Sequence, residues 1–134
     1  MPTSTFMPDV TVEIAFDSGY TTAAASRTWT DVSAYVEADD ILSIARGRGD
    51  EFSTPQPSRL SLTLDNRDGR FTPEYASGAY YPNVKKGRPI RVRATWPLGG
   101  GGTTHYRFLG YIDEWPVQWP GGGAEMSTVT ISAT

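Results

Sequence analysis

The strongest constraint on the fold is a strict alternation of apolar and polar residues in several separate segments. In the first segment the apolar positions are Val10, Val12, Ile14 and Phe16, and the residues between them are Thr11, Glu13 and Ala15. Successive side chains of a β-strand point to opposite faces, so a period of two indicates a strand buried on one face. The same pattern returns near residues 60–64, 90–96, 106–112 and 126–133. The chain is therefore predicted to be all-β.

Turn-forming residues separate these segments, and helix signals are weak. The chain has 14 glycines and 10 prolines, which suits many turns. Asp31 is placed to cap one helical turn that reaches Tyr35, and residues 73–81 suit a second. Residues 53–58 contain two prolines and are predicted to be an extended crossing loop. The expected fold is an antiparallel β-barrel or sandwich of about seven or eight strands with one or two short helical turns.

Length and charge bound the organisation of the chain. Its 134 residues suit a single domain over residues 1–134, either standing alone or as the N-terminal domain of a longer protein. The net charge is −6 over residues 1–45, +5 over 46–93 and −2 over 94–134. Opposed patches of this kind favour head-to-tail contact between copies, although charges scattered over a folded surface explain them equally well.

Several classes of chemistry find little support in the residues. There is no cysteine, which excludes disulfides and thiolate chemistry, and residues 1–8 lack the features of a signal sequence. His105 is the only histidine and lies beside a glycine-rich turn. The run Asp65-Asn66-Arg67-Asp68-Gly69 has the wrong spacing for a calcium loop, and a turn in which Asp and Asn bond to the backbone explains it better. The sequence therefore predicts no catalytic residue, no metal and no cofactor.

A basic stretch over residues 85–93 is the one candidate for contact with nucleic acid. No aromatic residue is interleaved with it, and the chain is acidic overall. A solvated strand face, or a sheet edge that charge protects from aggregation, explains this stretch better.

Aromatic residues gather late in the chain and leave two classes of function open. Trp115-Pro116 and Trp119-Pro120 surround two extended residues, and the neighbouring prolines and glycines make it hard to bury both tryptophans. Exposed tryptophans are typical of protein interfaces and also of sugar-binding platforms. The chain is thus expected to be a protein-docking module or a carbohydrate-binding module that recognises cell-surface polysaccharide.

Six segments in order resemble the minor tail proteins of long-tailed phages, especially phages of actinobacterial hosts. The segments are Trp29-Thr30-Asp31-Val32-Ser33-Ala34-Tyr35-Val36, Ile44-Ala45-Arg46-Gly47-Arg48, the stretches 62–73, 81–84 and 87–92, and Arg107-Phe108-Leu109-Gly110-Tyr111-Ile112-Asp113-Glu114-Trp115-Pro116. The Gly-x-Pro-Ile-x-Val strand and the later Phe-x-Gly-Tyr-Ile strand are also similar to the tube-like domains of phage baseplate hubs.

This resemblance implies a structural, non-enzymatic role in the virion, at the distal tail or baseplate hub. The expected partners are copies of the same chain, which form a ring, and other tail proteins assembled in the host cytoplasm. No membrane contact is expected, and DNA is expected only as passing cargo. The predicted contact surfaces are residues 46–58 and 115–123, and the predicted interaction residues are Arg46, Arg48, Phe52, Trp115 and Trp119.

Overall fold

The computed structural model describes residues 8–37, 43–48, 50–96, 102–119 and 127–134. Its described part forms one antiparallel sheet of eight strands, with two short 3-10 turns. The strands are β1 (Asp9–Ile14), β2 (Thr30–Asp31), β3 (Ser43–Gly47), β4 (Gln56–Asp65), β5 (Pro89–Trp96), β6 (Thr103–Glu114), β7 (Val117–Gln118) and β8 (Thr128–Ala133), and the turns are η1 (Ala24–Ser26) and η2 (Ser33–Tyr35). The predicted all-β antiparallel class and the number of strands are confirmed, and the sheet is not closed into a barrel.

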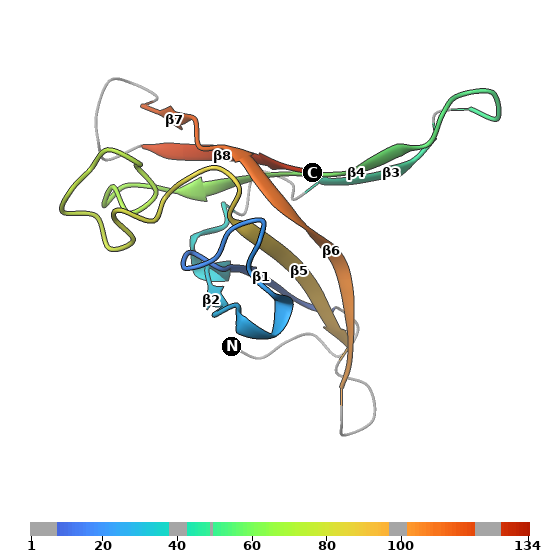
Figure 1. Cartoon of the computed structure of the whole chain (residues 1–134), viewed down its shortest axis with the longest axis horizontal. Coiled ribbons are helices and arrows are strands. Elements are labelled where there is room, and N and C mark those ends of the chain that lie inside the picture. The colour runs from blue at the N-terminus through green and yellow to red at the C-terminus, as the bar shows by residue number, and fades with distance from the viewer. Residues whose placement is uncertain (1–7, 38–42, 49, 97–101, 120–126) are drawn as a thin grey trace.

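The sheet is folded across β6, which joins its two halves (Figure 1). The strand order is β2-β1-β5-β6-β8-β4-β3, and β7 pairs with β8 beside this path. Most of β6 pairs with β5, whereas its last residues, Ile112 and Glu114, pair with Ala133 and Ser132 of β8. A strand shared in this way turns one continuous sheet into two layers that enclose a core.

The core lies between the two halves. The first half contributes Val12, Ile14, Ile90, Val92 and Phe108, and the second contributes Leu60, Leu62, Leu64, Val129 and Ile131, all of which are buried. Four buried side chains from outside the strands complete this core, and they are Val32, Phe71, Val84 and Trp115. These strand positions are the apolar ones of the alternating segments, so the sequence pattern determined which face of each strand is buried.

A β-bulge changes the expected direction of one side chain on β6. Val92 pairs with Phe108 and Arg93 pairs with Tyr106, so Arg107 is an extra residue between two paired positions. Tyr106 is consequently 62% exposed while Phe108 is buried, although both have the same parity in the sequence.

The predicted short turns are only partly helical. Asp31 Oδ1 accepts a hydrogen bond from the backbone N–H of Ser33 at 2.9 Å, at the start of the 3-10 turn η2 that ends at Tyr35. Residues 73–81 form hydrogen-bonded turns but no helix.

The turn after β4 bonds to its own backbone, as the sequence predicts. Asp65 Oδ1 accepts from the N–H of Arg67 at 3.0 Å, and Asp68 Oδ1 accepts from the N–H of Arg70 at 3.2 Å. Gly69 adopts a left-handed φ of 74°, a conformation that favours glycine.

Candidate functional site

The most unusual feature of the molecule is a two-stranded arm formed by β3 and the first half of β4. These strands pair from Ser43↔Ser61 to Gly47↔Gln56, whereas β8 pairs with β4 only from Leu60 onward. Residues 56–59 therefore have a strand partner on one side alone within the described residues. The arm projects well beyond the body of the molecule (Figure 1).

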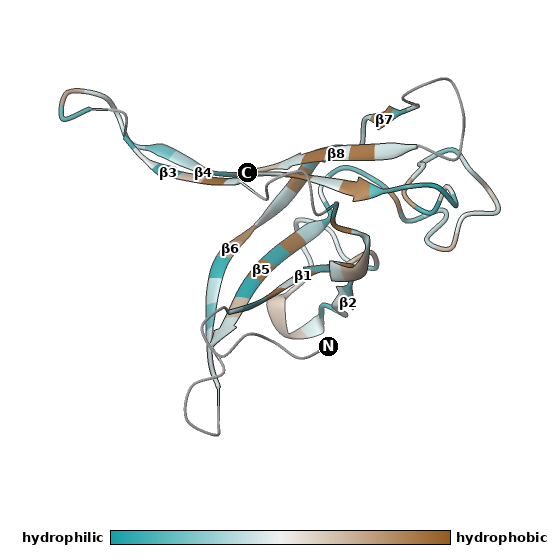
Figure 2. Cartoon of the chain, turned by 180° about the vertical axis from the view of Figure 1, so that it is seen from behind, coloured by the Kyte–Doolittle hydropathy of each residue, from teal (hydrophilic) through white to brown (hydrophobic). Residues whose placement is uncertain are grey.

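The arm corrects the prediction of an extended crossing loop over residues 53–58, within the predicted contact surface 46–58. Arg46 and Gly47 belong to β3, and Gln56, Pro57 and Ser58 belong to β4, so only residues 48–55 connect the strands. The arm is exposed on both faces, with only Ile44 and Ser58 half-buried among residues 43–47 and 56–59. The ribbon of the arm is mostly teal and white in Figure 2, the colours of hydrophilic and intermediate residues.

Local hydrogen bonds order the tip of the arm. Asp50 Oδ1 accepts from the N–H groups of Phe52, at 2.9 Å, and Ser53, at 2.7 Å. Arg48 Nη1 donates to the carbonyl oxygen of Glu51 at 3.2 Å. This turn holds the Phe52 side chain outward at 90% exposure, so a large apolar group stands at the end of a polar arm.

The two late tryptophans differ in position. Trp115 is only 8% exposed, its ring lies 6.1 Å from those of Phe16 and Phe71, and its Nε1 donates to the carbonyl oxygen of Lys85 at 2.8 Å. The ring is therefore a core group, which corrects the expectation that Trp115 projects from the surface. Trp119 is 55% exposed.

Four of the five predicted interaction residues are exposed. Arg46, Arg48 and Phe52 lie on the arm, and Trp119 follows β7 at the other end of the sheet. The structure therefore places three of them together and separates the two tryptophans from them. The part of the predicted 115–123 surface beyond residue 119 lies outside the described residues.

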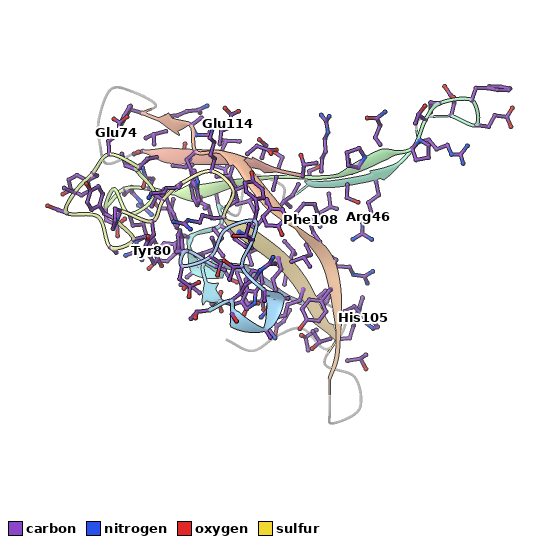
Figure 3. The ribbon with its side chains drawn as sticks, viewed as in Figure 1. Arg46, Glu74, Tyr80, His105, Phe108 and Glu114 are labelled. Atoms are coloured by element: carbon purple, nitrogen blue, oxygen red, sulfur yellow. The ribbon has the colours of Figure 1, made fainter. Side chains whose placement is uncertain are left out.

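Two grooves lie beside predicted interaction residues, one next to Arg46 and the other next to Trp119. The first, of about 220 Å³, lies between the base of the arm and β6, and its lining residues are Arg46, Ser58, Tyr106, Arg107, Phe108 and Leu109. The labelled side chains of Arg46 and Phe108 lie in this region, and His105 lies further along β6 (Figure 3). The second, of about 280 Å³, lies beside Trp119 and is lined by the turn after β4 and by Tyr75, which is 47% exposed.

A third groove, which the sequence did not predict, lies over Trp115. It has a volume of about 540 Å³ and is lined by Pro73, Val84, Lys85, Lys86, Asp113, Glu114 and Trp115. Its residues come from three separate segments, so no local pattern could have indicated it. The two lysines and the two acidic residues are exposed, whereas Val84 and Trp115 are buried.

The basic stretch 85–93 is largely used inside the molecule. Arg91 Nε lies 2.6 Å from Glu13 Oε2, and Arg93 Nη2 lies 3.3 Å from Glu13 Oε1. The Arg91 guanidinium also stacks over Trp29, 4.2 Å from the ring centre. Because β5 lies between β1 and β6, this stretch is not a sheet edge, which corrects one of the two interpretations given for it.

His105 is exposed on β6. Among the described residues, no three His, Cys, Asp or Glu side chains gather as a metal site would require. No helix in the same part of the chain has the length and apolar character needed to cross a membrane.

Comparisons with known proteins give a structural similarity but no match in sequence. No family model and no curated protein matches the chain. Among solved structures, the chain is similar to one described as the crystal structure of an Hcp protein, with 12% identity over 93% of this chain and 86% of that chain and a TM-score of 0.31.

Proposed function

We propose that this chain is a structural subunit of a phage tail, which assembles through protein–protein contacts into a ring at the distal end of the tail. The observation that carries the proposal is the β3–β4 arm with Phe52 at its tip. A two-stranded ribbon is at best marginally stable alone in water, and an aromatic side chain held 90% exposed gains stability only when another surface covers it. Contact with a neighbouring subunit meets both needs.

The assignment to a phage tail rests on the sequence segments between Trp29 and Pro116, which resemble, in the same order, segments of phage minor tail proteins. In the structure these segments span both halves of the sheet, from η2 through the arm to the end of β6. A ring forms when a subunit contacts its neighbour through two different surfaces and the rotation between copies closes. The arm supplies one such surface.

The test is the state of association of the pure protein. Light scattering after size exclusion, over a range of concentrations, is expected to show oligomers, and negative-stain electron microscopy is expected to show rings. A strictly monomeric particle at high concentration, together with no affinity for any tail component, would refute the proposal. Tape-measure and other tail genes beside the gene for this chain would support it.

A carbohydrate-binding role is a second candidate, favoured by the groove beside Trp119. Two exposed aromatic rings, Trp119 and Tyr75, line it together with polar groups of Arg67, Asp68 and Thr72. Titration with host cell-wall polysaccharide is then expected to shift the tryptophan fluorescence, and Trp119→Ala is expected to abolish the shift. An unchanged spectrum would remove this candidate.

A further inference from the structure

The groove over Trp115 is suited to an aromatic side chain flanked by charges of both signs. Its floor is formed by Trp115, Val84 and Pro73, and its lining is mostly apolar. Lys85 and Lys86 stand in one segment of its rim, and Asp113 and Glu114 stand in another. The groove is shallow and open, and its volume of about 540 Å³ leaves room for a bulky side chain.

The tip of the arm has the matching chemistry. Phe52 is the most exposed of the large apolar side chains in the described residues, and Asp50 and Glu51 precede it directly. Arg48 belongs to the same turn, where it donates to the carbonyl oxygen of Glu51. The tip thus combines one aromatic ring, two acidic groups and one basic group, and the groove offers apolar walls, two basic groups and two acidic groups.

The two surfaces are far apart on one molecule. In Figure 3 Glu114, at the end of β6, lies over the body of the molecule, well away from the tip of the arm. Because the tip is held at the end of the paired strands β3 and β4, it does not fold back over the body, so one chain does not fill its own groove. A second copy of the chain is the occupant that carries the matching charges.

We infer that the arm tip of one copy docks in the Trp115 groove of the next, with Phe52 on the apolar floor. In this arrangement Asp50 and Glu51 face Lys85 and Lys86, and Arg48 faces the acidic rim. The contact joins two different surfaces, so it is head-to-tail and continues from copy to copy until a ring closes. The inference rests on the proposed self-assembly and names the two surfaces that carry it.

The first experiment blocks each surface in turn. The arm variant is Phe52→Ala, and the groove variant is Lys85→Glu combined with Lys86→Glu, all at exposed positions. Val10→Ala, at a 48% exposed apolar residue of β1, is the matched control. Sedimentation velocity over a concentration series is expected to show association weakened about tenfold or more in both blocked variants. Phe52→Ala removes the central aromatic anchor that dominates such interfaces, and the two Lys→Glu changes place like charges opposite Asp50 and Glu51. The control is expected to associate as the unmodified chain does.

Mixing the two blocked variants tests the head-to-tail geometry. The arm variant retains an intact groove and the groove variant retains an intact arm, so a mixture has one functional contact per pair. Only two-chain complexes are expected from the mixture, and no rings. Charge reversal gives an independent check, since Glu51→Lys is expected to restore association to a chain carrying Lys85→Glu.

A cross-link gives direct evidence, because the chain contains no cysteine of its own. Chains carrying Glu51→Cys, which keep Phe52, mixed with chains carrying Lys86→Cys are expected to form a disulfide-linked dimer on oxidation, whereas Val10→Cys in place of Lys86→Cys gives none. If the unmodified chain assembles and neither blocked variant differs from it, the docking inference is wrong and the proposed function stands. If the unmodified chain remains monomeric throughout, the proposed self-assembly is wrong as well.

Discussion

The side chain of Asn66 holds the turn after β4 to the neighbouring segments through three hydrogen bonds. Its side chain is 1% exposed and lies in the turn after β4. Oδ1 accepts from the backbone N–H of Phe71 at 2.8 Å, and Nδ2 donates to Thr72 Oγ1 at 2.8 Å and to Ser127 Oγ at 3.2 Å. One amide therefore fixes the loop that carries the buried Phe71 ring and ties it to the segment that precedes β8.

The substitution Asn66→Ala removes all three hydrogen bonds and leaves a buried donor without a partner. A hydrogen bond inside a protein stabilises it by about 1 kcal/mol net, and an unsatisfied buried N–H costs about 1–3 kcal/mol. The Thr72 and Ser127 hydroxyls lose a donor and can rotate to bond to other groups, but the N–H of Phe71 loses its acceptor and cannot turn away. We therefore expect the free energy of unfolding to fall by about 3 kcal/mol, a large fraction of the 5–15 kcal/mol typical of a domain.

Urea unfolding followed by tryptophan fluorescence measures this loss. The denaturation midpoint is expected to fall while the slope stays unchanged, because the same surface is exposed on unfolding. Asn83→Ala is the matched control, since Asn83 is exposed and its side chain makes only a 3.5 Å contact with Arg88. A loss below about 1 kcal/mol at Asn66, or an equal loss at Asn83, would refute the reasoning.

Three further predictions follow from buried or paired groups. Gly110→Ala places a Cβ 2.6 Å from the carbonyl oxygen of Thr134, so the urea midpoint is expected to fall by the equivalent of about 1–3 kcal/mol. Glu13→Gln leaves Arg91 and Arg93 of β5 without their carboxylate partner. Thermal unfolding is expected to show that the free energy of unfolding falls by about 2 kcal/mol. The loss is smaller than for a fully buried ion pair because both arginines are partly exposed. Hydrogen bonds from neighbouring arginines lower the pKa of Asp65 and Asp68 below 3.8, so their contribution to stability is complete above pH 3.8 and is lost as the pH falls through the lowered values. Acid titration of the unfolding midpoint, with and without Asp65→Asn, measures that contribution.

The buried half of the structure could be predicted from the sequence because burial leaves a local pattern. Wherever one face of a strand packs on the core, apolar residues repeat with a period of two, as at Leu60, Leu62 and Leu64. The turn after β4 could be predicted for a similar reason, since Asp and Asn bond to the backbone within a few residues of themselves.

The candidate site could be predicted only in part, because its features depend on exposure or on distant segments. The arm has no buried face, so its strands carry no alternation, and Pro55 and Pro57 favoured a loop. Trp115 and Trp119 stand in the same Trp-Pro context, yet only tertiary packing against Phe16 and Phe71 buries the first. The Trp115 groove joins residues from three segments, and one sequence contains no signal for that proximity.

The composition of the arm favours recognition by side chains over open-ended strand pairing. An exposed strand edge is a template for addition of further strands, and proteins limit this with prolines, charges and bulges. The arm has all three, with Pro57 in β4, Arg46 and Arg59 on its strands, and a register shift between Ala45 and Gly47. Pro57 has no N–H to donate to an added strand. A subunit contact that uses the arm must then draw its affinity from the tip, where Phe52 is exposed, and a closed ring follows more readily from such a single-site contact than from an edge that accepts any strand.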